Sequence, residues 1–240
     1  MGYGGLTYLY MPLVVINLAK FIEDDGYEAI PYGHQSDWRA IDNEGGSRPG
    51  YSRPVRPGQA SPDVMVHQRI AAYLCGLGEI GYSKVLLTPE FGPRQRVGIV
   101  ITDAELEPDP IIAPGTICDR CMLCARDCTG KAISTSESVK VVVAGRELEW
   151  GALDYEGCSR AFCGANHHHN PFAVTDEDRE HFARRNEESE GYKVSPTYGY
   201  GRALEGARGC IRACMIHLEQ QGKLGNTFDR PFRRRAEWRL

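Results

Sequence analysis

Apolar residues recur at helical spacing over residues 11–25, and Gly26 follows as a helix stop signal. Residues 28–32 then have the pattern of a short strand. Residues 33–62 are rich in Gly, Pro, Ser and Arg, and glycine and proline in particular favour turns over regular structure. The pattern predicts a helix and a strand followed by a long loop, and loops of this length are usually functional or disordered.

The next apolar segment predicts a helix over residues 63–74, with Pro62 beside its start. Two segments with β-forming residues follow at 85–87 and 97–102, separated by a stretch that contains two prolines and one glycine. We expect these two segments to form a pair of strands joined by that turn-rich stretch.

The second half of the chain alternates between regular and irregular segments. Residues 139–144 and 146–150 lie on either side of a single glycine, which predicts a hairpin. Residues 165–200 are polar, charged and poorly periodic, as expected of an insertion. The last predicted helix covers residues 206–221 and ends at Gly222.

The cysteine pattern carries the main chemical signal. The chain has nine cysteines, and four of them stand close together at Cys118, Cys121, Cys124 and Cys128. Their spacing, C-x2-C-x2-C-x3-C, is that of bacterial ferredoxins. Short gaps wrap the backbone so that the first three thiolates reach one 4Fe–4S cubane, while the fourth cysteine ligates a second cluster. The run therefore predicts further ligands downstream.

Cys210 and Cys214 preserve the C-x3-C end of a second run, but the two earlier positions of that run hold other residues. The remaining downstream cysteines are Cys158 and Cys163, and the spacing leaves open which of them are ligands. We expect the first cluster to be held by Cys118, Cys121, Cys124 and Cys214. We expect the second cluster to be held by Cys128, Cys158, Cys163 and Cys210.

A zinc site is the alternative interpretation, since zinc proteins also use C-x2-C pairs. Zinc takes four tetrahedral ligands, however, and three cysteines at successive two-residue gaps favour a cluster. Cys75 stands apart from the other cysteines in an apolar helical segment. We expect it to be a small buried residue of the core.

A glycine motif precedes the cysteines. Gly76, Gly78 and Gly81 match G-x-G-x-x-G, which in a dinucleotide-binding fold follows a strand and opens a helix. Here a predicted helix precedes the glycines and a strand follows them. We therefore expect a tight turn in which the backbone closely approaches another group. The three glycines also stay candidates for cofactor binding.

Two arginines follow the glycine motif. Arg94 and Arg96 flank Gln95 on a strand-like segment, so both side chains should project to one face. A solvated pair explains this pattern. A pocket for an anionic group or a leaving halide explains it equally well, because the guanidinium charge is fixed.

Three segments and the cysteine run that follows them resemble the reductive dehalogenase and epoxyqueuosine reductase superfamily. They occur in the same order as in that superfamily. They are residues 71–81, 86–94 and 100–103. The resemblance covers residues 10–135 well and the C-terminal cysteines loosely. It implies a corrinoid-binding, nitroreductase-like domain followed by a ferredoxin-like module, whose two 4Fe–4S clusters pass electrons to the cobalt.

The expected fold class is α+β, and the proline-containing connector at residues 109–114 places a domain boundary near residue 112. By resemblance, residues 1–112 form a shortened nitroreductase-like α/β domain of the corrinoid-binding type. Residues 113–240 form a bacterial ferredoxin-like two-cluster domain with an insertion at 165–200.

The resemblance also suggests catalytic groups. Dehalogenases of the family use a tyrosine backed by a basic residue as a proton donor, and epoxyqueuosine reductases use an aspartate. By position and chemistry, the candidates in this chain are Tyr32, Arg94 and Arg96. The implied cofactors are two 4Fe–4S clusters and a corrinoid (cobalamin), with Gly76, Gly78 and Gly81 as candidate contacts to the latter.

We therefore expect an iron-sulfur oxidoreductase, with reductive dehalogenation or epoxide-type reduction as its chemistry. The alternative is a non-catalytic, ferredoxin-like electron-transfer subunit that docks onto a separate reductase. The expected electron donor is a ferredoxin or a flavodoxin.

Charge and hydropathy limit the setting of the protein. A formal net charge of -4 gives no reason to expect a nucleic-acid partner. The apolar stretch at residues 11–16 is too short to span a bilayer, and no basic segment precedes it as in a secretory signal. Cysteine-rich chains without an export signal keep their thiols free in a reducing compartment, so we expect a cytoplasmic protein.

Overall fold

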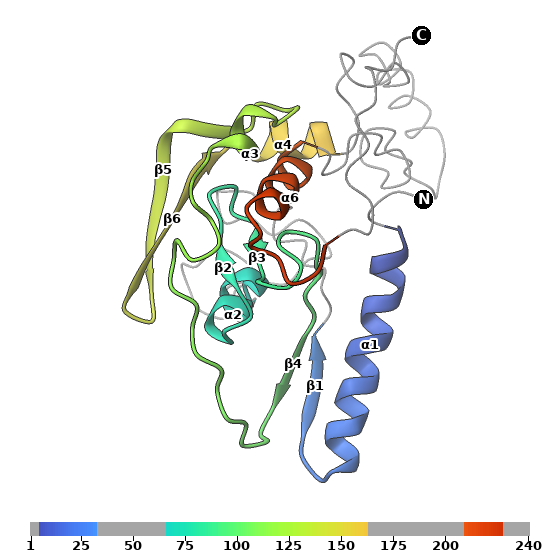
Figure 1. Ribbon diagram of the computed structural model, residues 1–240. Coiled ribbons are helices and arrows are strands. Elements are labelled where there is room, and N and C mark those ends of the chain that lie inside the picture. The colour runs from blue at the N-terminus through green and yellow to red at the C-terminus, as the bar shows by residue number, and fades with distance from the viewer. Residues whose placement is uncertain (1–4, 33–65, 163–208, 228–240) are drawn as a thin grey trace, which may run out of the picture.

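The described structure combines one long helix and several shorter ones with three two-stranded antiparallel sheets. It is a computed structural model that describes residues 5–32, 66–162 and 209–227 (Figure 1). The mixed helix and strand content agrees with the expected α+β class. The predicted loop at 33–62 and the predicted insertion at 165–200 lie outside the described residues.

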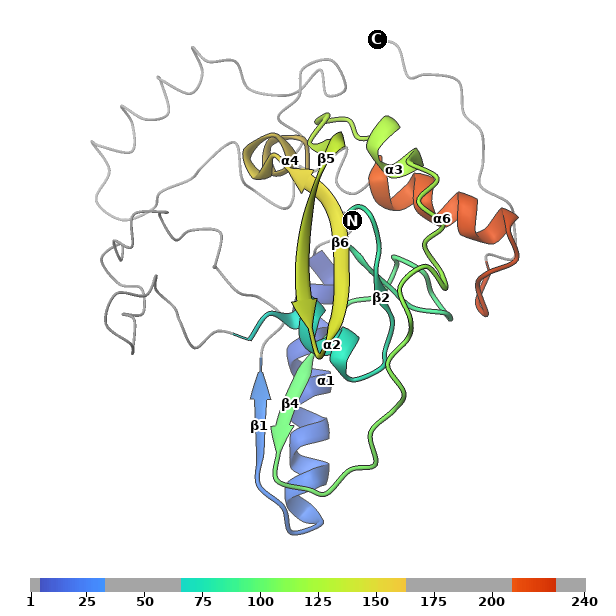
Figure 2. The ribbon, with the colours of Figure 1, turned by 90° about the vertical axis from the view of Figure 1, so that its left-hand side faces the viewer.

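Helix α1 (Gly5–Asp24) packs against a sheet formed by β1 (Ala29–Tyr32) and β4 (Ile99–Thr102) (Figure 2). The predicted helix and strand are therefore confirmed, although the helix begins several residues earlier. Gly26 has a φ of 96°, a left-handed conformation that favours glycine, so it suits the turn that ends the helix. Val15 is buried, and Gly98 beside β4 approaches its side chain closely.

The predicted pairing of strands 85–87 and 97–102 is wrong. β3 (Leu86–Leu87) pairs instead with β2 (Glu79–Ile80), and β4 pairs with β1. The reason is local, because Lys84 takes a left-handed φ of 61° that closes a tight hairpin between β2 and β3. After β3 the chain turns away through the bridge between Thr88 and Gly92.

The predicted hairpin around Gly145 is confirmed and is longer than expected. β5 (Ile133–Val143) pairs with β6 (Arg146–Leu153). Ala144 and Gly145 have φ values of 49° and 72°, so two consecutive left-handed residues form the turn, as in a type I′ hairpin. Leu148 and Trp150 of β6 pack in a core cluster with Tyr73, which lies in the helix that precedes β2.

That preceding helix is α2 (Gln68–Leu74), which is shorter than the predicted 63–74. His67 sits at its N-cap, where the ring nitrogen accepts a hydrogen bond from the Ile70 N–H at 3.3 Å. The cap sets the helix start, so the apolar pattern before it does not continue the helix. Residues 63–65 lie outside the described residues.

Three helices surround the cysteines: α3 (Leu123–Arg126), α4 (Tyr155–Phe162) and α6 (Cys210–Gln220). α3 packs beside α6, and both views place them at the end of the molecule away from the α1 turn (Figures 1 and 2). The predicted end of the last helix is confirmed, because Gly222 follows α6 with a left-handed φ of 64°.

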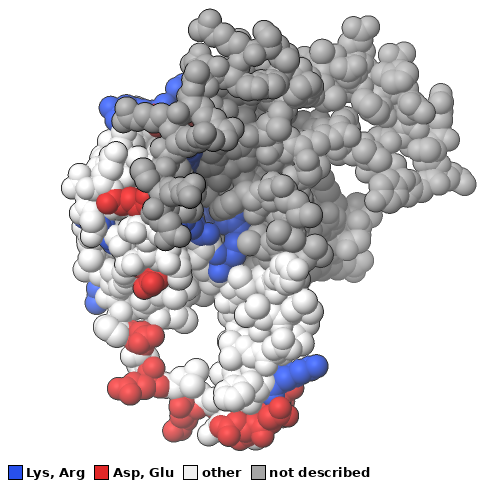
Figure 3. All heavy atoms as spheres, turned by 45° about the vertical axis from the view of Figure 1, so that its right-hand side comes forward, with Lys and Arg blue, Asp and Glu red and all other residues white. Residues whose placement is uncertain are grey.

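Acidic side chains gather at the opposite end, where α1 ends and β4 leads into the connector (Figure 3). The exposed acids in this region are Glu23, Asp24, Asp25, Glu28, Asp103, Glu105 and Glu107. The backbone N–H of Glu28 donates to Asp103 Oδ1 at 2.8 Å, which joins the two segments. Within the ranges that the structure describes, no helix is both long and apolar enough to cross a membrane.

Candidate metal centre

One pocket is lined by four thiols that come from distant parts of the chain. They belong to Cys118, Cys121, Cys124 and Cys214. The first two stand in the loop before α3, Cys124 lies in α3, and Cys214 lies in α6. α3 packs against α6, which places Cys124 and Cys214 on neighbouring helices. The structure thus brings together the four cysteines predicted for the first cluster.

The loop that carries the first cysteines has an unusual backbone. Arg120 and Met122, on either side of Cys121, have φ values of 56° and 62°. Residues other than glycine adopt this left-handed conformation rarely, and it costs about 1–3 kcal/mol each when the surroundings impose it. The two reversals turn the chain around Cys121, whose N–H also donates to Asp119 Oδ1 at 3.2 Å. Such strain is typical of a ligand-holding loop.

Burial makes these thiols poor acids in the cluster-free protein. Burial, and then the neighbouring Cys118 and Cys121 thiolates, raise the pKa of Cys124 to about 11, above the ordinary value of a thiol. Burial likewise raises the pKa of Cys121 and of Cys214. Thiolates crowded into a low-dielectric pocket need positive charge beside them. The donor set therefore fits a cationic group that binds several thiolates at once, as an iron-sulfur cluster does.

A second group of thiols lies next to the first. Burial, followed by the charges of the nearby Cys128 and Cys158 thiolates, raises the pKa of Cys210 to about 12. Cys158 and Cys210 both pack against the apolar cluster that contains Cys128. The backbone N–H of Ala132 donates to Cys128 Sγ at 3.3 Å. Three of the four cysteines predicted for the second cluster are thus neighbours, and Cys163 lies outside the described residues.

The rim of the first pocket offers a different set of donors. One ligand atom each from Asp119, Cys121 and His217 lies within 4.8 Å of the others. His217 Nε2 is 2.7 Å from Asp119 Oδ2. Burial opposes ionisation of Asp119, but the hydrogen bond and charge of His217 hold the pKa of this carboxyl below its usual value. A single ion at this rim would engage one of the four pocket thiols, whereas a cluster can engage all four.

Two contacts of Cys118, which lines the pocket, were not predicted from the sequence. The carboxylate of Glu79, buried at 1% exposure, accepts hydrogen bonds from the N–H groups of Ile117 and Cys118. The N–H of Tyr82 donates to Cys118 Sγ at 3.4 Å. The signal that points to Glu79 is its place inside the glycine motif, where a charged residue interrupts apolar and glycine positions.

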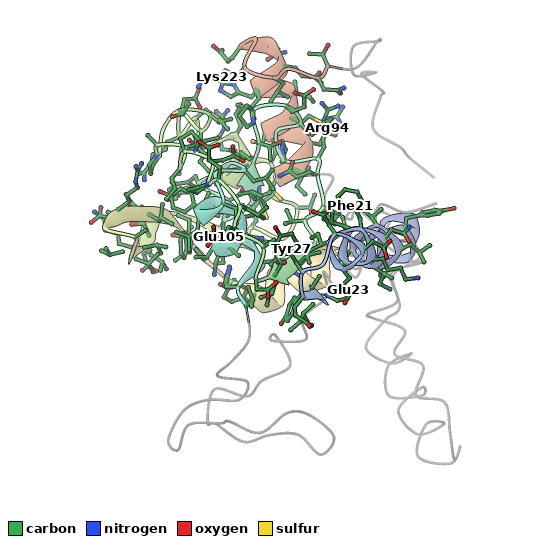
Figure 4. All side chains as sticks on the ribbon, turned by 90° about the horizontal axis from the view of Figure 1, so that it is seen from below. Phe21, Glu23, Tyr27, Arg94, Glu105 and Lys223 are labelled. Carbon is green, nitrogen blue, oxygen red and sulfur yellow. The ribbon has the colours of Figure 1, made fainter. Side chains whose placement is uncertain are left out.

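The structure places the candidate catalytic residues outside the thiol pocket. Tyr32 ends β1, and neither it nor Arg94 nor Arg96 lines the pocket. The expectation that the arginines lie on a strand is wrong, because β4 begins only at Ile99. Arg94 instead donates through Nη2 to the backbone and side-chain oxygens of Asn226. It lies beside α6, away from Phe21 and Glu23 of α1 (Figure 4).

The glycine motif forms the close turn predicted for it. α2 precedes the motif and β2 runs through it, so the order is the reverse of a dinucleotide-binding fold. Gly76 has a φ of 73°, and a Cβ on Gly78 would lie 2.1 Å from the Leu87 carbonyl oxygen. Only glycine allows this approach. Binding of a corrinoid by Gly76, Gly78 and Gly81 stays a prediction.

The expectation for Cys75 is wrong. This residue is exposed rather than buried. It occupies the C-cap of α2, where the helix has ended and the side chain no longer faces the core.

Comparisons with known proteins give a consistent relationship over part of the chain. No protein-family model matches it. It is 32% identical over 140 residues to a tetrachloroethene reductive dehalogenase of Desulfitobacterium hafniense. The matched segment covers 58% of this chain and 20% of the relative. The enzyme of the same name from Sulfurospirillum multivorans is 36% identical over 112 residues, and this match covers 41% of this chain and 22% of the relative. The chain is similar to reductive dehalogenases.

The chain spans about a fifth of the length of the curated reductive dehalogenases that it matches. A solved catabolic reductive dehalogenase is 26% identical, with a TM-score of 0.39 over 60% of this chain and 17% of that one. A TM-score this low establishes no shared fold. The expected likeness to reductive dehalogenases is confirmed, and the likeness to epoxyqueuosine reductases stays a prediction.

Proposed function

We propose that this chain is the iron-sulfur part of a reductive dehalogenase-like oxidoreductase and holds two 4Fe–4S clusters. The gathering of Cys118, Cys121, Cys124 and Cys214 around one pocket carries the proposal. The neighbouring group of Cys128, Cys158 and Cys210 supports a second site. A 4Fe–4S cluster supplies one-electron transfer, with a potential that depends on hydrogen bonds to the sulfurs and on burial.

The protein's own groups would tune such centres. In each thiol group, one described backbone N–H donates to a sulfur: Tyr82 to Cys118, and Ala132 to Cys128. Hydrogen bonds of this kind withdraw electron density from the ligand sulfur and stabilise the reduced cluster. Cys121 is the exposed member of the first group, whereas Cys124 and Cys128 are buried. We infer that electrons enter at the Cys121 side.

The chemistry proposed for the complete protein is reductive dehalogenation, which the names of its relatives support. Two electrons and one proton convert a carbon-halogen bond into a carbon-hydrogen bond and release halide. A mechanism of B12-dependent dehalogenation has been suggested from the structure of one reductive dehalogenase. We accordingly propose a corrinoid as the electron acceptor, a nitroreductase-like arrangement before the connector, and a ferredoxin-like arrangement after it.

A non-catalytic electron-transfer subunit is the second candidate, with a ferredoxin or flavodoxin as donor and a separate reductase as acceptor. Two observations favour it. Arg94, a candidate for contacting substrate, is instead bonded to Asn226. The outer side of α1 exposes Tyr10, Val14 and Phe21 at 60%, 60% and 71%, and exposed apolar patches of this kind suit a protein partner. The described cysteines form no disulfide with one another, which suits a reducing, cytoplasmic setting.

Anaerobic purification followed by iron, sulfide and absorption analysis tests the proposal. We expect about eight iron atoms and eight sulfides per chain, the content of two 4Fe–4S clusters. Cys214→Ala and Cys210→Ala should each remove a different cluster signal in electron paramagnetic resonance, and Cys75→Ala is the matched control that should remove neither. Zinc in place of iron, or the loss of one and the same signal in both variants, would overturn it.

Turnover separates the two candidate functions. Loaded protein is mixed with cobalamin, a strong reductant and tetrachloroethene, the substrate named for the relatives. Halide release with an altered cobalt spectrum supports the enzyme. Reducible clusters with no corrinoid binding and no halide release support the electron-transfer subunit.

A further inference from the structure

A buried carboxylate holds the first cysteine of the run. Glu79 Oε1 accepts a hydrogen bond from the Cys118 N–H at 2.6 Å, and Oε2 accepts one from the Ile117 N–H at 3.1 Å. Its side chain is among the most buried in the described part, at 1% exposure. Both carboxylate oxygens are therefore directed at the backbone of the residue that would bind iron and of its neighbour.

The hairpin of β2 and β3 delivers this carboxylate. Glu79 lies in β2 opposite Leu87, and the absence of a side chain on Gly78 lets the two strands approach closely. Leu87 and Ile117 are both nearly inaccessible and belong to one apolar cluster, so the segment that Glu79 contacts is itself immobilised by packing. The glycine motif thus acquires a role through the charged residue at its centre.

The same hairpin also contacts the sulfur of Cys118. Three residues after Glu79, the Tyr82 N–H donates to Cys118 Sγ at 3.4 Å. One short segment therefore holds both ends of the cysteine, the backbone through a carboxylate and the thiol through a backbone amide.

Stability alone does not account for Glu79. Burying a carboxylate is costly, and an apolar side chain at a fully buried position avoids that cost. Within the described residues Glu79 forms no ion pair, and its hydrogen bonds come from two main-chain donors. Its particular contribution is geometric, because each of its two carboxylate oxygens accepts a hydrogen bond from one of two consecutive N–H groups.

We propose that Glu79 is a positioning residue for the first 4Fe–4S cluster. Its carboxylate fixes the backbone of Ile117 and Cys118 so that the Cys118 thiolate faces its iron and the Tyr82 N–H. This inference rests on the proposed function. Groups that orient a metal ligand from outside typically change metal retention by about 10–100-fold when they are removed.

Three substitutions separate geometry from bulk. Glu79→Gln keeps the shape but replaces one acceptor by an NH2 group that faces a backbone donor. Glu79→Asp keeps both acceptors but shortens their reach by one methylene. Glu79→Ala removes both, and the other two variants decide the matter if it does not fold. Thr88→Val is the matched control, because Thr88 is also buried and bonded to a backbone N–H, that of Phe91, at the end of the same hairpin.

The measurements are iron release to a chelator and the electron paramagnetic resonance spectrum of the reduced protein. All Glu79 variants should release iron from one cluster at least about tenfold faster than wild type. They should also change the line shape of that cluster's signal and leave the signal of the other cluster unchanged. Thr88→Val should change neither property, even at an equal loss of thermal stability.

Two results would overturn the inference while leaving the proposed function intact. One is wild-type iron release and spectra in loaded Glu79→Gln and Glu79→Asp protein. The other is equally fast iron release from Thr88→Val, which would make the effect one of general stability. A wild-type protein that contains no iron-sulfur cluster would instead reject the proposed function, and the inference with it.

Discussion

Gly78→Ala is the substitution whose consequence the structure defines most sharply. The new Cβ would lie 2.1 Å from the Leu87 carbonyl oxygen and 2.8 Å from its carbonyl carbon. Cβ contacts below 3.0 Å are essentially never seen, so the strands must separate by at least about 0.9 Å. The obstacle is backbone rather than a flexible side chain, and Leu87 is the residue paired with Glu79, so the hairpin itself must open.

Two costs combine in this variant. Forcing extra volume into a packed site typically costs about 1–3 kcal/mol. Weakening a buried hydrogen bond between Glu79 and the backbone of Ile117 or Cys118 adds a penalty of about 1–3 kcal/mol. The two costs add to about 2–6 kcal/mol, and we expect a total near 3 kcal/mol, in the lower half of that range. This is a large part of a typical folding free energy of about 5–15 kcal/mol.

Thermal unfolding of loaded protein, prepared anaerobically at equal iron content, measures this loss. A chain of about this length loses roughly 2–4 °C of midpoint per kcal/mol, so the midpoint should fall by about 6–12 °C. Gly225→Ala is the control, because its Cβ would meet the carboxylate end of the Glu90 side chain at 3.1 Å, and that side chain can move. A midpoint for Gly78→Ala within about 2 °C of the control would refute the reasoning.

Three further variants or conditions have defined outcomes. Cluster-free protein should lose stability as pH rises above 9. Burial raises the pKa of Cys124 to about 11 and of Cys210 to about 12. The folded state therefore keeps protons that the unfolded state releases. Melts at about pH 8 and about pH 10.5 should show this fall, of up to about 1.4 kcal/mol per pH unit and thiol, and loaded protein should not. Arg94→Ala should lower the melting midpoint by several degrees through loss of the Asn226 contacts while leaving the iron content unchanged; a drop in iron content would contradict this. Trp150→Ala should cost about 3–5 kcal/mol in a denaturant melt, since the indole is buried in the core, and a smaller loss than 1 kcal/mol would count against that packing.

Local signals in the sequence predicted the regular elements well where a single residue type decides the geometry. Gly26, Gly145 and Gly222 each take a left-handed φ, and each stands where a turn or helix end was expected. The pairing of β3 failed because pairing is a long-range property. Both candidate partners of β3 are short, and the left-handed residue of the turn that joins β2 to β3 is Lys84 rather than a glycine.

The site divides in the same way. Cysteine spacing predicted that Cys214 joins the first thiol group, because in two-cluster ferredoxins the last cysteine of one run ligates the cluster of the other run. Glu79 was missed because the glycine motif marks its position but does not reveal that its carboxylate is buried against two backbone N–H groups. Cys75 was misplaced because an apolar helical pattern does not indicate at which residue the helix ends.

The contacts of the β2–β3 hairpin bear on the predicted division of the chain near residue 112. Glu79 and Tyr82 belong to the hairpin, before residue 112, but they contact residues after it. Both form hydrogen bonds with Cys118, and the Tyr82 carbonyl accepts one from the N–H of Gly151. If the two segments were independent folding units, Gly78→Ala would disturb the first and leave iron retention in the second unchanged. Because the hairpin holds the first cysteine of the run through both its backbone and its sulfur, we expect iron to be released faster as the melting midpoint falls. A loaded Gly78→Ala protein that melts early yet keeps its iron as tightly as wild type would favour two independent units and remove the hairpin from the metal centre.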